Sequence, residues 1–520
     1  MIRLESYLQG QWTSGEGDGS TLVDPASEQG VATASTKGLD FDGALRFGRE
    51  KGGPALRAMS YAERGALLMA MSKALHAERE QLIDDSILNA GTTRTDSKFD
   101  IDGATGTLAY YAGLAKTLGS ERTLNGLGTV EGEGEQLTRS KRFWGTHIRT
   151  PVRGVAVHVN AFNFPAWGFA EKAAVALLAG VPVVTKPATA TALPTWRCIK
   201  ILVDAKILPE GALQLVCGSP GEMLTHLRTG DVLAFTGSGT TGAHLRRLEA
   251  VTERSVRINV EADSLNATVL GPDVEVGSET WFAFVRDAVR EVTQKTGQKC
   301  TATRRIFVPK KHMDAVLETL AEEMGRVPFG HPAAEGVRVG PLASAQQHKD
   351  VREGLDALVA AGAKIAWQGS GAFEGATEGK GYFVHPTLLR ADSPRDVGLV
   401  HEREVFGPAS TVMPYDTPEE AAELVALGEG GLVAAIYGND KDTLRTLVEG
   451  IAPWSGRVLI GSKKVADQAI SPGLVLPSCV HGGPGRAGGG EELGGRRGLD
   501  LYTQRTAVQG DRALLDKLFE

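Results

Sequence analysis

The chain has 520 residues, of which 42% are hydrophobic and 23% are charged, and its net charge is −7. This balance is typical of a globular protein with enough apolar surface for roughly three domains. It excludes a strongly basic protein that binds nucleic acid and a disordered acidic chain.

The N-terminal third begins without a basic segment followed by an apolar run, so we expect no signal peptide. Residues 60–90 predict one long amphipathic helix, because Ser60 and Glu63 match a capping box and apolar residues recur at helical spacing. A charged, glycine-rich stretch follows near 119–135, and residues 136–150 are predicted to be extended and basic.

From residue 152 onward, short apolar runs alternate with helical patterns. A helix is predicted from Pro165 to Gly180. The predicted strands of this series lie at 155–159, 181–185, 213–216 and 232–235. The longest apolar stretch, near 173–184, is shorter than the about 20 residues that cross a bilayer. We therefore expect no membrane partner and a cytoplasmic protein.

A second alternating series follows residue 266, and strand–helix–strand alternation indicates parallel sheets. Its strands are predicted at 268–270, 305–308, 432–437 and 457–460, with helices near 279–294 and 311–325. The predicted fold class is α/β, with two doubly wound Rossmann-like domains and a small β oligomerisation arm. The predicted boundaries are 1–130 with 152–265 for the dinucleotide-binding domain, 266–480 for the catalytic domain, and 131–151 with 481–520 for the arm.

Cys300 is the most informative of the cysteines. They lie at positions 198, 217, 300 and 479. They form no CxxC pair and no cluster with histidine, so we predict neither a disulfide scaffold nor a metal site. Most free cysteines are buried and inert. Cys300, however, follows the polar segment 297–299 on a predicted loop, where reactive groups usually lie, and Lys299 could favour its thiolate.

Two further side chains suit the same chemistry. Asn163 lies between a predicted strand and the helix that begins at Pro165, where free N–H groups and the helix dipole could stabilise an alkoxide. Alone, it reads as an ordinary helix cap. Glu261 follows a predicted strand, and an isolated glutamate there is usually solvated or paired. A thiol, an amide and a carboxylate are the parts needed to oxidise an aldehyde through a thioester.

A glycine-rich turn over 235–242 joins a predicted strand to a predicted helix from Ala243. Such a turn lets a pyrophosphate approach N–H groups at a helix start, although it matches neither GxGxxG nor GxxxxGK[ST]. Lys186 closes the strand at 181–185 and could bind a ribose hydroxyl or a phosphate. Without further context, it reads as an ordinary surface lysine.

Together these motifs resemble the aldehyde dehydrogenase superfamily over nearly the whole chain. The resemblance depends on segments 163–165, 186–188, 235–238, 297–300 and 404–408 and on Glu261, which occur in the order of the family and at its spacing. Two alternatives to hydrolytic oxidation stay open. One is a dehydrogenase of the same family that releases the acyl group to coenzyme A (CoA), which Glu261 disfavours. The other is a structural homologue without turnover.

The resemblance implies a role for each matched residue. Cys300 is the expected nucleophile, Asn163 the oxyanion donor and Glu261 the base of deacylation, with Lys172 and Glu492 as a proton relay. The expected cofactor contacts are Lys186 and Thr189 at the adenosine ribose, Gly237 and Ser238 under the pyrophosphate, and Glu404 and Phe406 at the nicotinamide ribose.

Two departures from the common family pattern bear on specificity. Many members that prefer NAD carry a glutamate where this chain has Thr189, and that carboxylate repels a 2′-phosphate. We therefore predict NADP, with NAD as the alternative. Segments 261–264 and 481–490 also resemble the branch that oxidises CoA-linked semialdehydes in aromatic-acid degradation. A general aliphatic or aromatic aldehyde is the other possibility, and we expect a homodimer.

Overall fold

The computed structural model describes residues 1–468 and 470–519. The N-terminal half is built on a sheet with strand order β13-β12-β9-β10-β11-β2-β3. Its strands are β2 (Ser6–Leu8), β3 (Gln11–Thr13), β9 (Ala156–Val159), β10 (Val183–Lys186), β11 (Leu213–Leu215), β12 (Val232–Thr236) and β13 (Arg257–Glu261). Strands β9 to β13 run parallel, and β2 pairs antiparallel with β11.

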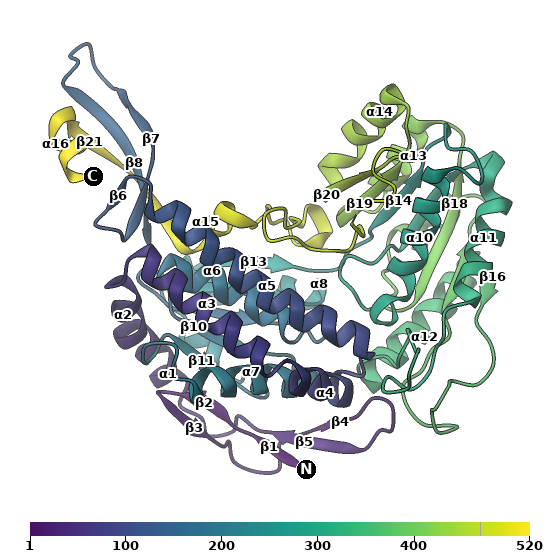
Figure 1. Ribbon diagram of the computed structural model, residues 1–520, viewed down its shortest axis with the longest axis horizontal. Coiled ribbons are helices and arrows are strands. Elements are labelled where there is room, and N and C mark those ends of the chain that lie inside the picture. Colours follow the sequence, from purple (N-terminus) through teal and green to yellow (C-terminus); the bar gives the residue numbers. More distant parts are fainter. Residues whose placement is uncertain (469, 520) are drawn as a thin grey trace.

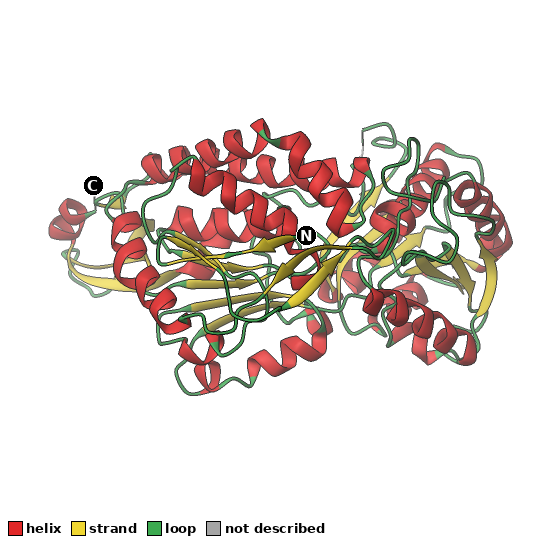
Figure 2. Ribbon diagram, turned by 90° about the horizontal axis from the view of Figure 1, so that it is seen from below, coloured by secondary structure: helices red, strands yellow, loops and turns green. Residues whose placement is uncertain are grey.

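Helices cover both faces of this sheet, as Figure 2 shows. On β9, Ala156 packs into one apolar cluster, whereas its neighbour Val157 packs into another on the opposite face. The first cluster contains α3 (Tyr61–Ala77), α5 (Arg94–Gly119), α6 (Trp167–Ala179) and α7 (Ala192–Asp204). The second contains α1 (Phe41–Phe47), α8 (Gly239–Arg246) and α9 (Glu249–Thr252). The half is therefore doubly wound.

The second half repeats this architecture on a sheet with strand order β16-β17-β18-β15-β14-β19-β20. Its strands are β14 (Ala267–Leu270), β15 (Arg305–Pro309), β16 (Lys364–Gln368), β17 (Thr387–Arg390), β18 (Ala409–Tyr415), β19 (Gly431–Tyr437) and β20 (Ser455–Gly461). Helices α10 (Glu279–Thr293) and α11 (Met313–Gly325) pack on one face, and α12 (Ala345–Ala360), α13 (Pro418–Ala426) and α14 (Lys441–Ile451) on the other. The two halves lie side by side in Figure 1.

A third sheet forms an arm that projects from the N-terminal half (Figure 1). Its order is β21-β8-β7-β6, with β6 (Thr123–Leu124), β7 (Gly128–Gln136), β8 (Phe143–Pro151) and β21 (Thr503–Asp511), and α16 (Arg512–Leu518) follows it. A small sheet of β1 (Ile2–Leu4), β4 (Ser20–Val23) and β5 (Gly30–Ala34) completes the N-terminus. The arm strand β7 starts at Gly128, so the boundary predicted at residue 130 falls inside a strand.

The helix predicted over 60–90 is wrong as a single helix. Its capping box is confirmed, because Ser60 accepts from the N–H of Glu63 and the Glu63 carboxylate accepts from the N–H of Ser60. However, α3 ends at Ala77, because Glu78 leaves the helical region with a φ of −100° and a ψ of 22°. The next helix, α4 (Arg79–Ala90), begins after Glu78. Both helices pack against α5, which the sequence did not predict.

Among the described residues, no helix is long and apolar enough to cross a membrane. The parallel strands bring several predicted site residues to one edge. Lys186 ends β10 and pairs in register with Val159, while Glu261 ends β13 opposite Thr236. In open α/β sheets this carboxyl edge is where ligands bind.

Candidate active site

The loop that carries Cys300 lies between α10 and β15 and has an unusual backbone. Lys295, Thr296 and Gly297 have φ values of 52°, 55° and 66°. A side chain at Gly297 would be strained at this φ, and its Cβ would lie 2.1 Å from the carbonyl oxygen of Gly407. The tight turn therefore packs the loop directly against segment 404–408.

A buried ion pair anchors the same loop. Lys299 Nζ lies 2.8 Å from Glu291 Oε2, and both side chains are fully buried. Glu291 also accepts from Ser471 Oγ and, at 3.1 Å, from the N–H of Gly473. Lys299 thus ties the loop to α10 and to the C-terminal segment.

The hypothesis that Lys299 favours the Cys300 thiolate is not supported. Lys299 Nζ donates to Glu291 and Gln294. Burial, followed by the negative charges of Glu261 and Glu171, holds the pKa of the Cys300 thiol well above its ordinary value. These surroundings favour the thiol form of Cys300 over the thiolate.

We predict that Lys299→Met destabilises the protein by about 3–5 kcal/mol, because it leaves the Glu291 carboxylate buried without its counter-ion. The matched control is Arg326→Met, which removes the ion pair to Glu322, where both side chains are 62% exposed. The control substitution should lower the free energy of unfolding by about 0–1 kcal/mol. Urea unfolding monitored by circular dichroism measures both. Equal losses in the two variants would contradict the anchoring role of Lys299.

Two asparagines hold the loop from either side. Asn266 Nδ2 donates to the carbonyl oxygens of Cys300, at 2.7 Å, and Ala302, at 2.8 Å. Asn163 Nδ2 donates to the carbonyl oxygen of Gln298 at 3.1 Å. Asn163, which is buried, and Cys300 line the same cavity. The structure therefore places the Asn163 amide beside the loop that carries Cys300.

The N–H groups expected to be free at a helix start near Asn163 are already bonded. Helix α6 begins at Trp167, and the N–H groups of Ala166 and Trp167 donate to the Asp100 carboxylate at 3.2 and 2.9 Å. Asp100 lies on α5 and is itself buried. These donors are therefore occupied and not available to an oxyanion.

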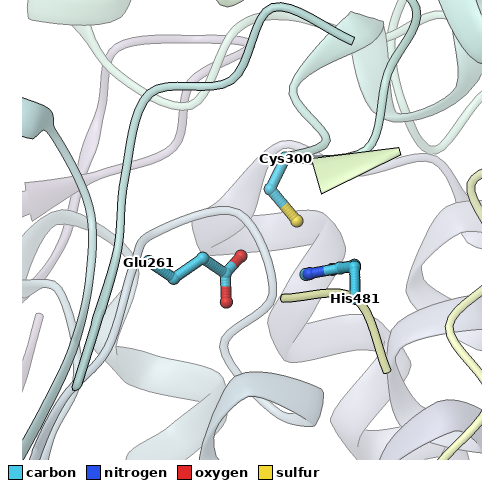
Figure 3. Close-up of side chains that lie close together, drawn as sticks. All are labelled: Glu261, Cys300 and His481. Carbon is cyan, nitrogen blue, oxygen red and sulfur yellow. The ribbon is translucent and has the colours of Figure 1, made fainter. Parts of the chain in front are cut away.

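Glu261, Cys300 and His481 converge in the cavity, as Figure 3 shows. One carboxylate oxygen, the sulfur and one ring nitrogen all lie within 4.8 Å of one another. Oxygen, sulfur and nitrogen donors at this spacing could also hold a metal ion, which the sequence did not predict. The same cavity is lined by aromatic side chains, namely Phe99, Phe164 and Trp167.

Of the two residues expected to relay protons, the structure brings only Lys172 to this cavity. Lys172 Nζ lies 3.5 Å from Glu171 Oε1, whereas Glu492 pairs with Arg497 at 3.3 Å. Burial raises the pKa of Glu171, the charge of Lys172 opposes this, and Glu261 reinforces it. Within the described chain, Glu171 is the carboxylate that pairs with Lys172.

The expected cofactor residues lie along the carboxyl edge of the first sheet. Ser238 caps α8 by accepting from the N–H of Thr241, and Gly237 precedes it at the end of β12. Lys186 is buried at the end of β10, and burial lowers its pKa to about 8. A buried lysine of this kind gains from an anionic ligand, so these residues fit a dinucleotide phosphate or ribose. Thr189 begins the short helix Thr189–Thr191 and places no carboxylate there.

Glu404 and Phe406 lie where the halves meet the nucleophile loop. The Glu404 carboxylate accepts from the N–H of Ser264 at 2.9 Å and pairs with Arg304 at 3.1 Å. Phe406 packs edge-on against Phe162 at 5.7 Å between ring centres. A ribose would have to share Glu404 with Arg304.

Comparison with known proteins identifies the family. Residues 12–508 match the aldehyde dehydrogenase family. The chain belongs to this family. It is 43% identical over 485 residues, 93% of each chain, to the 3,4-dehydroadipyl-CoA semialdehyde dehydrogenase of Aromatoleum evansii. It is therefore an oxidoreductase of the aldehyde dehydrogenase type, and these enzymes use NAD or NADP.

Solved structures agree with this aldehyde dehydrogenase fold. A putative aldehyde dehydrogenase from Burkholderia cenocepacia matches with a TM-score of 0.84 and 26% identity, covering 98% of this chain and 97% of that one. PnpE in complex with nicotinamide adenine dinucleotide matches with a TM-score of 0.84 and 25% identity, over the same shares. The predicted α/β fold is confirmed.

Sequence reasoning missed two residues of this aldehyde dehydrogenase site. Glu171 directly precedes Lys172 in the chain, and His481 begins the unusual glycine-rich segment. Both line the cavity with Cys300. The adjacency of Glu171 to Lys172 was a usable signal, whereas nothing in the sequence places His481 beside Cys300.

Proposed function

We propose that this aldehyde dehydrogenase oxidises its substrate to a carboxylic acid through a thioester on Cys300. The observation that carries the proposal is that Cys300, Glu261 and Asn163 line one cavity. The sulfur attacks the aldehyde carbon, and the thiol proton leaves through water to solvent, which keeps Glu261 as a carboxylate for the second half of the reaction.

Asn163 and the backbone N–H of Cys300 are the proposed donors to the oxyanion, and losing one such donor typically costs about 2.7–4 kcal/mol. When bound, the nicotinamide cofactor accepts the hydride that leaves the aldehyde carbon. Gly237, Ser238 and Lys186 would hold its phosphates and adenosine ribose. Glu404 and Phe406 would contact the nicotinamide ribose.

Glu261 then accepts a proton from water, and the water oxygen attacks the thioester carbon. This base supports hydrolytic release over transfer to free CoA. Lys172 is the proposed link between Glu261 and a second carboxylate, and its pairing with Glu171 makes that residue the better partner than Glu492.

The proposed substrate is 3,4-dehydroadipyl-CoA semialdehyde or a related CoA-linked semialdehyde of aromatic-acid degradation, such as that of benzoate. The 43% identity to a dehydrogenase of that name supports this class, as do the departures at 261–264 and 481–490. NADP is the proposed cofactor, because Thr189 lacks the charge that would repel a 2′-phosphate.

A homodimer is the proposed assembly, and a cytoplasmic location stays a prediction. The arm exposes apolar side chains that a second copy could cover, namely Leu137, Phe143, Leu514 and Leu518.

Steady-state kinetics with CoA-linked semialdehydes and with simple aldehydes, each with NAD and with NADP, test this function. We expect kcat/KM to be about 10- to 100-fold higher for the CoA-linked substrate with NADP, because the binding energy of the remote CoA part lowers the activation barrier. Equal rates with simple aldehydes would contradict the substrate class, and a requirement for free CoA would favour acyl transfer.

Thr189→Glu should lower kcat/KM for NADP and leave kcat/KM for NAD unchanged.

A further inference from the structure

His481 lies at a junction between two cavities. It lines the cavity that holds Cys300, and it also lines a second cavity behind Glu261. Tyr111, Leu501 and Tyr502 line the second cavity but not the first. Both cavities share Glu171, Lys172 and Glu261. His481 and Glu261 therefore belong to the wall that the two cavities have in common.

The His481 side chain is well placed to hold a water molecule beside the Cys300 sulfur. Its ring nitrogen, the Cys300 sulfur and a Glu261 oxygen lie within 4.8 Å of one another (Figure 3). A single point can lie about 2.8 Å from two or three atoms at such spacing, and buried waters typically make about three hydrogen bonds. The common point of the three atoms is beside the sulfur that carries the acyl group.

The state of the imidazole fits this role. His481 is 7% exposed, and burial, followed by the charge of Arg457, lowers its pKa to about 4. Lys172 lowers the pKa further, and Glu171 opposes both cations. At neutral pH the ring is therefore uncharged and offers one donor and one acceptor. Its Nδ1 is buried and lacks a hydrogen-bond partner in the described chain, and such an orphan is costly unless a water satisfies it.

We propose that His481 is a catalytic residue of the hydrolytic half-reaction, where it holds the attacking water together with Glu261. The water oxygen bonds to the thioester carbon while one water proton passes to Glu261. The carbon–sulfur bond then breaks, the acid leaves, and the Cys300 sulfur takes a proton back. This role of His481 rests on the proposed Cys300 thioester, because His481 acts only after the thioester has formed.

The test is pre-steady-state kinetics of three variants with the semialdehyde and NADP. His481→Phe keeps a ring of similar size without nitrogen. His481→Asn and His481→Gln place an amide near Nδ1 and Nε2, respectively. We expect His481→Phe to keep the initial burst of reduced cofactor but to lose about 10- to 100-fold in steady-state rate. One of the two amide variants should recover most of that rate. The matched control is His385→Phe, whose ring packs against Phe329 and Phe373 outside the cavity lining, and it should behave as wild type.

Hydroxylamine separates a lost water from a damaged site. It is a stronger nucleophile that attacks the thioester carbon, releases the thiol and forms a hydroxamic acid, so it does not need an oriented water. It should restore turnover of His481→Phe more than that of wild type. A wild-type steady-state rate in His481→Phe, loss of its burst, or failure of both amide variants would overturn the proposal. So would loss of wild-type activity on treatment with a chelator, because a metal ion would then be the occupant of the cluster. An active Cys300→Ala variant would instead overturn the thioester itself.

Discussion

Cys300→Ala should abolish aldehyde oxidation, with a loss of at least about 10⁴-fold in kcat, because Cys300 is the one thiol among the described residues that line the cavity. The other described cysteines do not replace it. Cys198 and Cys217 are buried, and burial raises the pKa of each thiol well above its ordinary value. Absorbance of the reduced cofactor measures the rate, and the oligomeric state and circular dichroism confirm that the variant is folded.

Cys479→Ala is the matched control for this substitution and should keep wild-type activity. Cys479 is exposed, so iodoacetamide should modify it readily, whereas Cys300 is half-buried. Labelling therefore has to be done in the Cys479→Ala background, where alkylation of Cys300 should track the loss of activity. A substantial residual rate in Cys300→Ala would rule out the thioester mechanism.

Glu261→Gln should separate the two halves of the reaction. The amide cannot accept a proton from water, so the thioester should accumulate, and the steady-state rate should fall by about 10²- to 10⁴-fold. Stopped-flow absorbance should show a burst of reduced cofactor close to one equivalent per active site, followed by very slow turnover. The negative charge of Glu261 also helps to hold the Cys300 pKa high, so its removal should ease formation of the thiolate.

The outcome that contradicts this role is a variant whose burst and steady-state rate are both close to those of wild type. Loss of the burst together with turnover would assign Glu261 to thiol activation instead. Asp263→Asn is the matched control, because Asp263 follows Glu261 closely but accepts from the N–H of Gly239 at the start of α8. Asp263→Asn should therefore show no burst of reduced cofactor followed by slow turnover of the kind expected for Glu261→Gln.

The parts of this fold that the sequence predicted are those set by local pattern. Runs such as Val155 to Val159 bury residues on both faces of a parallel sheet, so they are mostly apolar and easy to recognise, with His158 as the polar exception. The site residues Cys300, Glu261 and Asn163 were located because each follows a predicted strand or helix and matches a motif of the family. All three line the cavity.

The parts that the sequence did not predict depend on contacts between distant segments. Helix α5 was not predicted because it contains several glycines and polar residues. Packing explains the glycine at position 103, since a Cβ there would lie 2.1 Å from the Trp167 ring. Lys299 reads as a solvated cation beside a thiol, yet it is fully buried against Glu291. The approach of His481 to Cys300 likewise follows from packing between segments that local patterns do not relate.

Mass spectrometry of the trapped intermediate tests the Cys300 thioester most directly. Glu261→Gln is mixed with the semialdehyde and NADP, quenched in acid and digested. We expect an added mass equal to the acyl group on the peptide that contains Cys300, released by hydroxylamine and absent without NADP. An unmodified Cys300 peptide after a full burst of reduced cofactor, or an acyl group on Cys479 instead, would contradict it.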